Sequence, residues 1–254
     1  MSFTAIVLAG SRPGRDAFAE QFGTDLKALI PVGGEAMVRR PVAALLASEA
    51  IGKVIVLSQA PERIAAVLPE DPRVASRQSL GTIAETLLAL CNDGSIEWPL
   101  LVTTGDHALL DAATVEEFCS AAADADVAIG VVEQATLMRR LPETRRTWVR
   151  FRGGAYTGAN LFALRSPAVA PAIELWRSVE QDRKKGWRLL SLFGPPVVVG
   201  AALRLLSLDD VLSRIGKKLG LSVKAVRLTN PLAGVDVDKA EDHALAERVL
   251  RSEA

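Results

Sequence analysis

The sequence of 254 residues contains few of the side chains from which many catalytic and metal sites are built: two cysteines, two histidines and one tyrosine. Cys91 and Cys119 stand 28 positions apart in segments with a helical pattern, and no spacing typical of a metal site occurs. We therefore expect both to be reduced core thiols in a cytoplasmic protein. His107 and His243 are expected to be structural or exposed.

The sequence also lacks an excess of charge and a long hydrophobic run. Its 30 basic and 30 acidic residues give no electrostatic reason to expect binding to nucleic acid or to an anionic membrane. The longest uncharged apolar run, residues 189–203, is 15 residues long and contains Gly-Pro-Pro, whereas a membrane span needs roughly 20 residues. No basic segment precedes the apolar residues 2–9, as it would in a signal peptide. We expect no transmembrane segment.

The first half of the chain alternates short β-branched runs with helical patterns. Strands are predicted at 4–10, 53–59, 99–106 and 126–133, and helices at 37–50, 61–70, 82–93 and 111–123, the last capped by Asp111. This alternation predicts an α/β fold, a three-layer α/β/α sandwich with a mostly parallel mixed sheet.

The second half changes character. A β-hairpin is predicted at 147–165 with Gly153-Gly154 at the turn, followed by mostly helical structure from 167 to 220 that begins at Ser166-Pro167 and restarts at a capping box of Ser207 and Asp210. A strand at 222–228 and a closing helix at 239–254 follow. We expect a single domain over 1–254 with a helical insertion at about 168–222. The insertion is either a helical subdomain packed on the sheet, or a lid over an apolar acceptor, a dimer contact or a membrane-surface contact.

The segment TAIVLAGSRPGRD, residues 4–16, is typical of a strand that runs into a phosphate-binding loop. A P-loop would end in Gly-Lys-Ser/Thr, whereas this loop ends in Gly-Arg-Asp. A dinucleotide-binding loop would place further glycines where Arg12 and Arg15 stand. Both of these phosphate loops are excluded, which leaves a surface turn without ligand or another kind of phosphate loop.

The same loop resembles the Leu-Ala-Gly-Gly-x-Gly-x-Arg signature of nucleotidyltransferases that join a nucleoside triphosphate (NTP) to a phosphorylated small molecule. These include sugar-phosphate nucleotidyltransferases, cytidylyltransferases of isoprenoid precursors and MobA-like guanylyltransferases. The residues at family positions are Leu8, Ala9, Gly10 and Arg15. Ser11 and Pro13 replace glycines, and Gly14 is offset by one position.

Five further segments resemble later blocks of this family, in the family's order. They are KALIPVGGEAMVRRPVAALL (27–46), SLGTIAETLLAL (79–90), LLVTTGDHALLDAATVEEF (100–118), YTGANLFALRS (156–166) and GVDVDKAEDHALAERVL (234–250). Together the blocks cover nearly the whole chain except about 168–222. Their order carries the resemblance, which implies a sheet of the nucleotide-diphospho-sugar transferase type.

The resemblance implies a nucleotide site formed by the first blocks. Arg15 and Lys27 would balance charge on the β- and γ-phosphates and are the predicted catalytic residues. The predicted nucleotide-binding residues are Leu8, Ala9, Gly10, Ser11, Gly14, Gly81 and Thr82. Arg12 is a further candidate without a family position. The alternatives are a solvated lysine at position 27 and a helix cap at Thr82.

The resemblance also implies a magnesium ion, or manganese, held by aspartates. Asp106 is the first predicted ligand, Asp236 the preferred second and Asp238 its alternative, because the carboxyl ends of parallel strands meet at one edge of a sheet. The alternatives are a turn cap for Asp106 and an acidic helix N-terminus for residues 236–242, which accounts well for Glu241 and Asp242 but poorly for Asp236.

A phosphorylated small-molecule acceptor is expected against the hairpin. Asn160 is a predicted contact, with a backbone bend as the alternative. Residues 142–154 contain four arginines, of which Arg146 and Arg150 are predicted to hold the acceptor's phosphate. The alternative is a solvated edge strand.

These observations predict a Mg-dependent nucleotidyltransferase, with a homodimer possible. Attack by an ionised phosphate oxygen on the α-phosphorus needs charge neutralisation and in-line positioning, not a strong base, which fits a chain with two histidines. A glycosyltransferase that uses a nucleotide sugar remains an alternative, although Gly-Asp-His stands where Asp-x-Asp would be expected. A non-catalytic nucleotide-binding protein is a second alternative, because Ser11 and Pro13 break the glycine signature.

Overall fold

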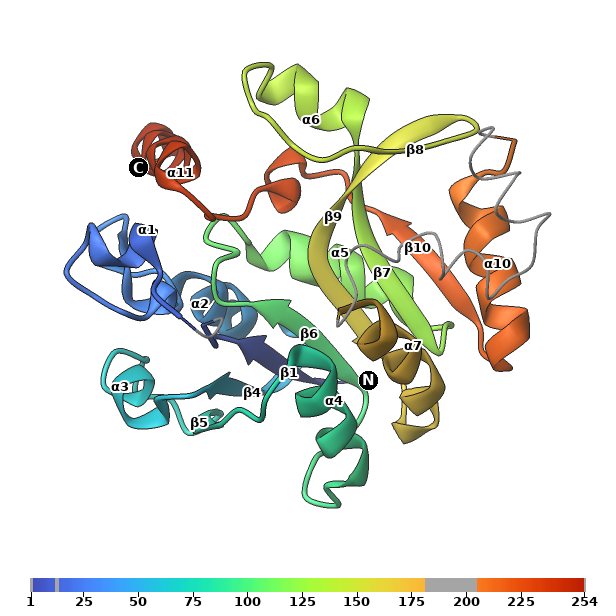
Figure 1. The fold of residues 1–254 in the computed structure, drawn as a ribbon, viewed down its shortest axis with the longest axis horizontal. Coiled ribbons are helices and arrows are strands. Elements are labelled where there is room, and N and C mark those ends of the chain that lie inside the picture. Colours follow the sequence, from blue (N-terminus) through green and yellow to red (C-terminus); the bar gives the residue numbers. More distant parts are fainter. Residues whose placement is uncertain (1, 12–13, 181–204, 254) are drawn as a thin grey trace.

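The computed structural model describes residues 2–11, 14–180 and 205–253. Within these ranges an eight-stranded mixed sheet runs in the order β10–β7–β9–β6–β1–β4–β5, with β8 added to β9 (Figure 1). The main strands are β1 (Phe3–Leu8), β4 (Ile51–Ser58), β5 (Val74–Gln78), β6 (Leu100–Thr104), β7 (Val127–Glu133), β9 (Gly154–Leu164) and β10 (Val223–Arg227). All neighbouring pairs are parallel except those that β9 makes. The predicted α/β class and mostly parallel sheet are confirmed.

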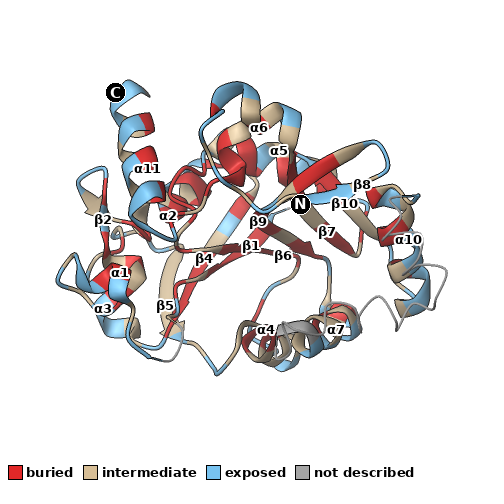
Figure 2. Ribbon diagram, turned by 45° about the horizontal axis from the view of Figure 1, so that its top comes forward, coloured by how far each residue is buried: buried red, intermediate tan, exposed pale blue. Residues whose placement is uncertain are grey.

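Alternate side chains of β1 point into two separate cores, as the period of two in a strand requires. Ala5 and Val7 join the core under α2 (Arg39–Ala47), α5 (Ala112–Ala122) and α11 (Ala240–Glu253), whereas Ile6 joins the core under α4 (Ile83–Asn92) and α7 (Ala170–Glu180). Figure 2 shows the sheet as a buried layer with α4 and α7 on one side and α2, α5 and α11 on the other. The predicted three layers therefore follow from a strand that is apolar on both faces.

The long strand β9 is antiparallel to both β6 and β7 and lies between them. It is connected to β8 (Val149–Phe151) by a tight turn, which confirms the predicted hairpin. The turn is one residue earlier than predicted: Arg152 and Gly153 form it, and Gly154 already begins β9. Gly153 has a φ of +93°, a conformation that favours glycine.

Among the elements that were not predicted are strand β5 and helix α6, and among those predicted too long are helix α3 (Pro61–Ala65) and strand β1. Strand β5 is short, polar and only half-buried, so it lacks the apolar pattern of the other strands. Helix α6 (Gln134–Arg140) follows β7 without a break. Helix α3 ends at Ala65 instead of residue 70, and β1 ends at Leu8 instead of residue 10. Both capping predictions hold for α5 and for α10 (Leu208–Leu219): Asp111 accepts from Thr114 N–H, and Ser207 and Asp210 form a reciprocal box.

Parts of the predicted insertion lie outside the described residues. Within the described ranges α7 and α10 are helical, and α10 packs on β10. Predictions that fall on 181–204, including the apolar run 189–203 and the basic residues 183–188, are outside the described ranges. The segment at Ser166 begins as the short 3₁₀-helix η2 (Pro167–Val169), and Ser166 makes no side-chain cap bond to it. Division into one domain plus an insertion stays a prediction.

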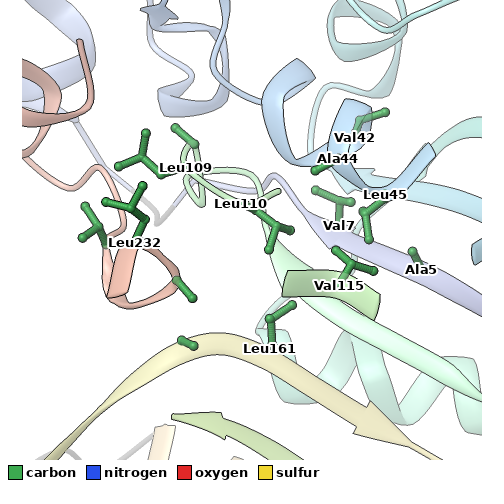
Figure 3. Close-up of a cluster of buried hydrophobic side chains, with 14 of the residues drawn as sticks. Ala5, Val7, Val42, Ala44, Leu45, Leu109, Leu110, Val115, Leu161 and Leu232 are labelled. Carbon is green, nitrogen blue, oxygen red and sulfur yellow. The ribbon is translucent and has the colours of Figure 1, made fainter. Parts of the chain in front are cut away.

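The loops that leave the carboxyl ends of β1 and β6 are bonded to each other and backed by a buried apolar cluster. Gly105 N–H donates to the Leu8 carbonyl over 2.9 Å, and a Cβ at Gly105 would lie 3.3 Å from that of Ala9. Leu109 and Leu110 pack beneath this junction (Figure 3). The two loops are thereby fixed side by side at one edge of the sheet.

Two further observations concern the predicted thiols and membrane segments. Cys119 is buried and Cys91 half-buried, and neither forms a disulfide. Burial, with a contribution from Glu116, raises the pKa of Cys119 to about 12, so the thiol is a poor nucleophile. None of the helices in the described ranges has the length and apolar character to cross a membrane.

Candidate active site

Lys27 is the central cation of the candidate site. It begins the 3₁₀-helix η1 (Lys27–Leu29), whose next residue, Ala28, is buried and accepts a backbone bond from Val38. The Lys27 ammonium donates to Asp106 Oδ2 over 2.6 Å and to Asp238. Its side chain is only 18% exposed. The structure thus places Lys27 in a buried charge cluster, which is not the solvated position that most lysines occupy.

The backbone explains why these aspartates meet. Asp106 directly follows the Gly105 turn after β6, and its carbonyl accepts a 3.0 Å bond from the N–H of Val237. Val237 is fully buried, and Asp236 and Asp238 flank it. Helix α11, which follows this segment, is also held to the N-terminal region, because His243 Nε2 lies 2.7 Å from the Pro31 carbonyl and the His243 ring contacts Phe22. The three predicted metal ligands therefore come from two segments that are bonded together.

Arg146 is buried between two carboxylates. Its Nη1 donates to Asp236 Oδ1 over 2.5 Å, and its Nη2 donates to the Asp236 carbonyl and to Asp242 Oδ1 over 3.1 and 3.2 Å. The Arg146 side chain is 9% exposed and that of Asp242 is 8% exposed. We call the six charged residues that meet here the aspartate cluster. They are Lys27, Asp106, Arg146, Asp236, Asp238 and Asp242.

Asn160 joins this cluster from β9. Its φ of +47° is left-handed, and it lies where the β7–β9 register shifts between Ile129 and Val131. Asparagine tolerates this conformation better than most residues do. The amide of Asn160 donates to Asp236 Oδ2 over 3.3 Å. The backbone-bend interpretation of Asn160 is confirmed, and the bend directs its side chain at a predicted metal ligand; contact of Asn160 with an acceptor stays a prediction.

The charged groups of the cluster shift one another's pKa values. Burial alone would lower the pKa of Lys27, but the Asp106 and Asp238 carboxylates outweigh it and hold that pKa above its ordinary value. Burial raises the pKa of Asp236; Arg146 opposes this shift, whereas the Asp238 and Asp106 carboxylates add to it. Burial would also raise the pKa of Asp238, but Lys27 outweighs it and lowers that pKa. Lys27 is thus firmly cationic, and further positive charge near Asp236 would favour its ionised form.

The cluster fits a divalent cation that substrate phosphates help to hold. Asp106 Oδ1 is buried and has no hydrogen-bond partner among the described residues, although a buried carboxylate oxygen normally has one. With all groups ionised, the two cations face four carboxylates, which leaves an excess of two negative charges. Within the described ranges no three His, Cys, Asp or Glu side chains form a metal site by themselves. A magnesium ion at this position would therefore need phosphate and water among its ligands.

The N-terminal loop is held by a residue that the sequence did not indicate. Gln59, directly after β4, accepts from the N–H of Ser11 over 3.0 Å and donates to the Ser11 carbonyl over 3.1 Å. The side-chain amide of Gln59 thus extends the hydrogen bonding between β1 and β4 beyond the ends of the two strands. Gly10 is needed at this point, because a Cβ there would lie 2.9 Å from the Gln59 amide. The Ser11 hydroxyl oxygen is buried without a partner among the described residues.

The other residues predicted for the nucleotide loop differ in their placement. Leu8 ends β1 half-buried, Ala9 is buried, and Gly14 has a φ of +110°. Arg15 is exposed and forms a two-bond ion pair with Glu20 over 2.7 and 2.8 Å, so it does not join the aspartate cluster. Arg12 and Pro13 lie outside the described residues. The nucleotide role of all these residues stays a prediction.

Gly81 and Thr82 form the start of α4. The Thr82 hydroxyl accepts from Glu85 N–H over 3.2 Å, and Glu85 accepts from Thr82 N–H over 2.8 Å. This reciprocal capping box confirms the structural interpretation of Thr82. A Cβ at Gly81 would lie 2.2 Å from Glu85 Oε2, so a larger residue there would displace the Glu85 side chain from the cap. Contact of either residue with a nucleotide base stays a prediction.

Arg150 is not brought into the aspartate cluster. It lies exposed on the edge strand β8 opposite Ala155, and it makes none of the contacts to the described aspartates that Arg146 makes. The two arginines predicted as a pair thus have different surroundings, and their contact with an acceptor stays a prediction.

Sequence reasoning missed Asp242 and Gln59. Asp242 was interpreted as an acidic residue favoured at a helix N-terminus, whereas its carboxylate is buried and bonded to Arg146 and to the Asp238 N–H. Its position four residues after Asp238, at the start of the closing helix, was the available signal. For Gln59, the signal was its place at the carboxyl end of the strand that neighbours β1.

The sequence was compared with models of protein families. Residues 5–207 match the model of the MobA-like NTP transferase domain. This range is most of the chain and contains Lys27, Asp106 and all of β1 but its first two residues, whereas Asp236 and Asp238 lie beyond it. Among proteins of curated function, none matches the sequence significantly.

Solved structures share the fold. A hypothetical transferase from Thermus thermophilus has 32% sequence identity and a TM-score of 0.81, and the match covers 96% of this chain and all of that one. The 4-diphosphocytidyl-2C-methyl-D-erythritol synthase of Anaerococcus prevotii has 13% identity, a TM-score of 0.61 and coverage of 98% and 96%. The 2-C-methyl-D-erythritol 4-phosphate cytidylyltransferase of Thermus thermophilus has 16% identity, a TM-score of 0.54 and coverage of 99% and 100%.

Proposed function

The chain belongs to the family of MobA-like NTP transferase domains, and on that premise we propose that it transfers a nucleoside monophosphate from an NTP to a phosphorylated small molecule, with release of pyrophosphate. The observation that carries this proposal is the bridge that Lys27 forms between Asp106 and Asp238, beside a buried Asp106 oxygen that lacks a partner among the described residues. Two of the solved neighbours are named for cytidylyl compounds, and one of those names includes a phosphorylated polyol, which supports this class of donor and acceptor.

In the proposed reaction, a phosphate oxygen of the acceptor attacks the α-phosphorus of the NTP. A new P–O bond forms there, the bond between the α-phosphorus and its bridging oxygen to the β-phosphorus breaks, and pyrophosphate leaves. The attacking oxygen is already ionised near neutral pH, so the protein has to neutralise charge and align the reactants rather than remove a proton. The buried aspartate cluster offers fixed charges for this purpose.

Lys27 is the proposed catalytic cation. Its ammonium lies in a partly buried site, where a charge acts more strongly than it does in water. When an NTP binds, Lys27 exchanges part of its contact with Asp238 for the triphosphate. The side chain of Asp238 is 60% exposed and therefore keeps solvent when that contact is given up. Arg15 contributes only after it leaves Glu20.

Mg²⁺ or Mn²⁺ would be held by Asp106 together with Asp236 or Asp238, and when bound it supplies charge neutralisation to the phosphate oxygens. Asp106 offers the unpartnered oxygen. Asp236 is held in place by Arg146 and Asn160. With all its groups ionised, the aspartate cluster has an excess of two negative charges, and a divalent cation would balance them.

The acceptor is proposed to bind along β9. Asn160 presents its amide there, and Arg146 lies beside it because both bond to Asp236. Arg150, on the exposed edge, is proposed to contact the acceptor's phosphate from the outer side. Because the cluster has an excess of negative charge, which repels phosphate, a phosphorylated acceptor is proposed to bind only when the metal is present.

The proposal is tested by measuring pyrophosphate release with each common NTP against a panel of sugar phosphates and other phosphorylated small molecules. We expect one pair to react in Mg²⁺, and Asp106→Asn to lower kcat/KM by about 10³-fold, because metal-held charge is worth several kcal/mol. Asp124→Asn is the matched control, since Asp124 pairs with Lys224 at an exposed site elsewhere.

Two outcomes would overturn the proposal. Tight binding of a nucleotide without pyrophosphate release from any pair would indicate a binding protein. Release of a nucleoside diphosphate from a nucleotide sugar would indicate a glycosyltransferase.

A further inference from the structure

Asp242 is a buried carboxylate that the proposed reaction does not use directly. It lies in the first turn of α11, and its side chain is 8% exposed. A carboxylate is rarely this buried without a specific partner. Its partners are therefore informative about its task.

Both oxygens of Asp242 are bonded, and each bond leads to a different proposed metal ligand. Oδ1 accepts from Arg146 Nη2 over 3.2 Å, and Arg146 in turn donates to Asp236 Oδ1 and to the Asp236 carbonyl. Oδ2 accepts from the backbone N–H of Asp238 over 3.3 Å. One side chain thus fixes the arginine that orients Asp236 and the backbone that carries Asp238.

The charge arrangement gives Asp242 a second task. Arg146 is 9% exposed and pairs with two carboxylates. If Asp236 turns toward a divalent cation, Arg146 loses part of one pair. Asp242 would keep the guanidinium balanced and in place, so that it does not compete with the cation for Asp236.

We propose that Asp242 is a positioning residue, which holds Arg146 and the Asp238 backbone so that Asp236 and Asp238 are available to a divalent cation. This inference rests on the proposed function, because it assumes that a cation binds at the aspartate cluster. Residues that hold metal ligands in this way typically change metal affinity by about 10- to 100-fold when they are substituted.

The test measures Mn²⁺ affinity of the full chain, without nucleotide, from the electron paramagnetic resonance signal of free Mn²⁺. The variant is Asp242→Asn, which keeps the shape but has one acceptor oxygen where Asp242 uses two, and therefore turns an NH₂ group toward Arg146 or toward the Asp238 N–H. We expect the dissociation constant for Mn²⁺ to rise by about 10- to 100-fold.

Glu241→Gln is the matched control. Glu241 is the adjacent residue, is 79% exposed and pairs with Lys239, so its substitution removes the same charge from the same helix turn without touching the cluster. We expect it to bind Mn²⁺ as the wild type does. If Glu241→Gln weakens binding as much as Asp242→Asn, the effect is general electrostatics and the inference is wrong.

Failure of the inference and failure of the proposed function give different results. If Asp106→Asn abolishes Mn²⁺ binding while Asp242→Asn binds as the wild type does, the metal site stands and the role of Asp242 is overturned. If the wild type and Asp106→Asn bind Mn²⁺ equally, the metal site itself is wrong and the inference fails with it.

If Asp242→Asn does not fold, the test uses the double variant Arg146→Gln, Asp242→Asn. In this variant two amides replace the buried ion pair. Replacing both partners of such a pair costs less than removing one. We expect this double variant to fold and to retain the weakened Mn²⁺ affinity. Wild-type affinity in the folded double variant would show that Asp242 serves only to balance Arg146 for folding.

Discussion

The N-terminal loop and the aspartate cluster were predicted from the same family resemblance, yet they hold their charged side chains in different ways. Arg15 pairs with Glu20, five positions away, and the guanidinium is exposed. Lys27 pairs with residues 79 and 211 positions away in a partly buried site. An exposed local pair contributes little and is easily exchanged, whereas the buried cluster exists only in the folded chain. The cluster is therefore the better-supported part of the site.

The largest effect that separates the two regions is expected from Lys27→Met. It removes the cation that joins Asp106 to Asp238, and we expect kcat/KM to fall by about 10²- to 10³-fold, the size of effect seen when one donor that stabilises transition-state charge is removed. Pyrophosphate release in steady state measures it. Lys224→Met is the control, because it breaks a lysine–aspartate pair outside the site. Retained activity would show that Lys27 serves the fold alone.

The second effect is a pH dependence of stability beside the cluster. Burial lowers the pKa of His107 to about 4, and the fully buried ring faces Thr103 over 3.3 Å. The folded protein resists protonation that the unfolded chain accepts, so this contribution is complete above pH 6.5 and is lost as the pH falls toward 4. Between about pH 7 and 5, the wild type is expected to lose about 2 kcal/mol of unfolding free energy through His107. We expect His107→Gln not to show this part of the loss.

Urea unfolding of both proteins at the two pH values measures that difference. An equal loss of stability in His107→Gln and in the wild type would assign the acid sensitivity to other groups, such as the carboxylates of the cluster.

The third effect concerns how the N-terminal loop is held. Gln59→Ala removes both bonds to Ser11, and at about 0.5–1.5 kcal/mol per bond we expect the KM for the NTP to rise by roughly tenfold. Gln59→Glu keeps one acceptor and loses the donor to the Ser11 carbonyl, so a smaller rise is expected. Isothermal titration with the reactive NTP provides the affinity directly. An unchanged affinity in both variants would mean that the loop does not need this clamp.

The smallest effect tests the exposed pair. Glu20→Gln releases Arg15 for the triphosphate, and since exposed pairs contribute about 0.2–1 kcal/mol, we expect the KM for the NTP to fall by at most about fivefold. Arg15→Ala should raise the KM instead. If neither variant changes the KM, Arg15 does not contact the nucleotide. The cations that face the triphosphate would then come from the aspartate cluster and not from Arg15.

The parts of the fold that the sequence predicted are those with a strong local pattern. Strands β1, β4, β6 and β7 are buried apolar runs, and helices α4 and α5 begin at recognisable caps. Strand β5 has the sequence VASRQ and pairs with β4 alone, so no apolar run indicates it. Boundaries were predicted less well than elements, as at α3 and at the β8–β9 turn.

The candidate site was predictable only where a residue's place in the sheet decides its surroundings. Asp106 lies where it was predicted, because it directly follows the end of β6, whereas the contacts that Lys27 makes with Asp106 and Asp238 were not predicted. The partners of Arg146 were not predictable, because 90 and 96 positions separate it from Asp236 and Asp242 and no periodicity connects them. Buried ion pairs of this kind depend on tertiary packing, which a single sequence does not express.

The position of β9 has a consequence for how the chain reaches this structure. Strands β6 and β7 precede β9 in the chain, yet β9 lies between them and is antiparallel to both. Any partly folded chain in which β9 has not yet paired therefore leaves one edge each of the two apolar strands β6 and β7 without a partner. Such edges pair wrongly when they meet too early. We therefore expect the refolding yield of the whole molecule to depend strongly on β9, the strand that carries Asn160.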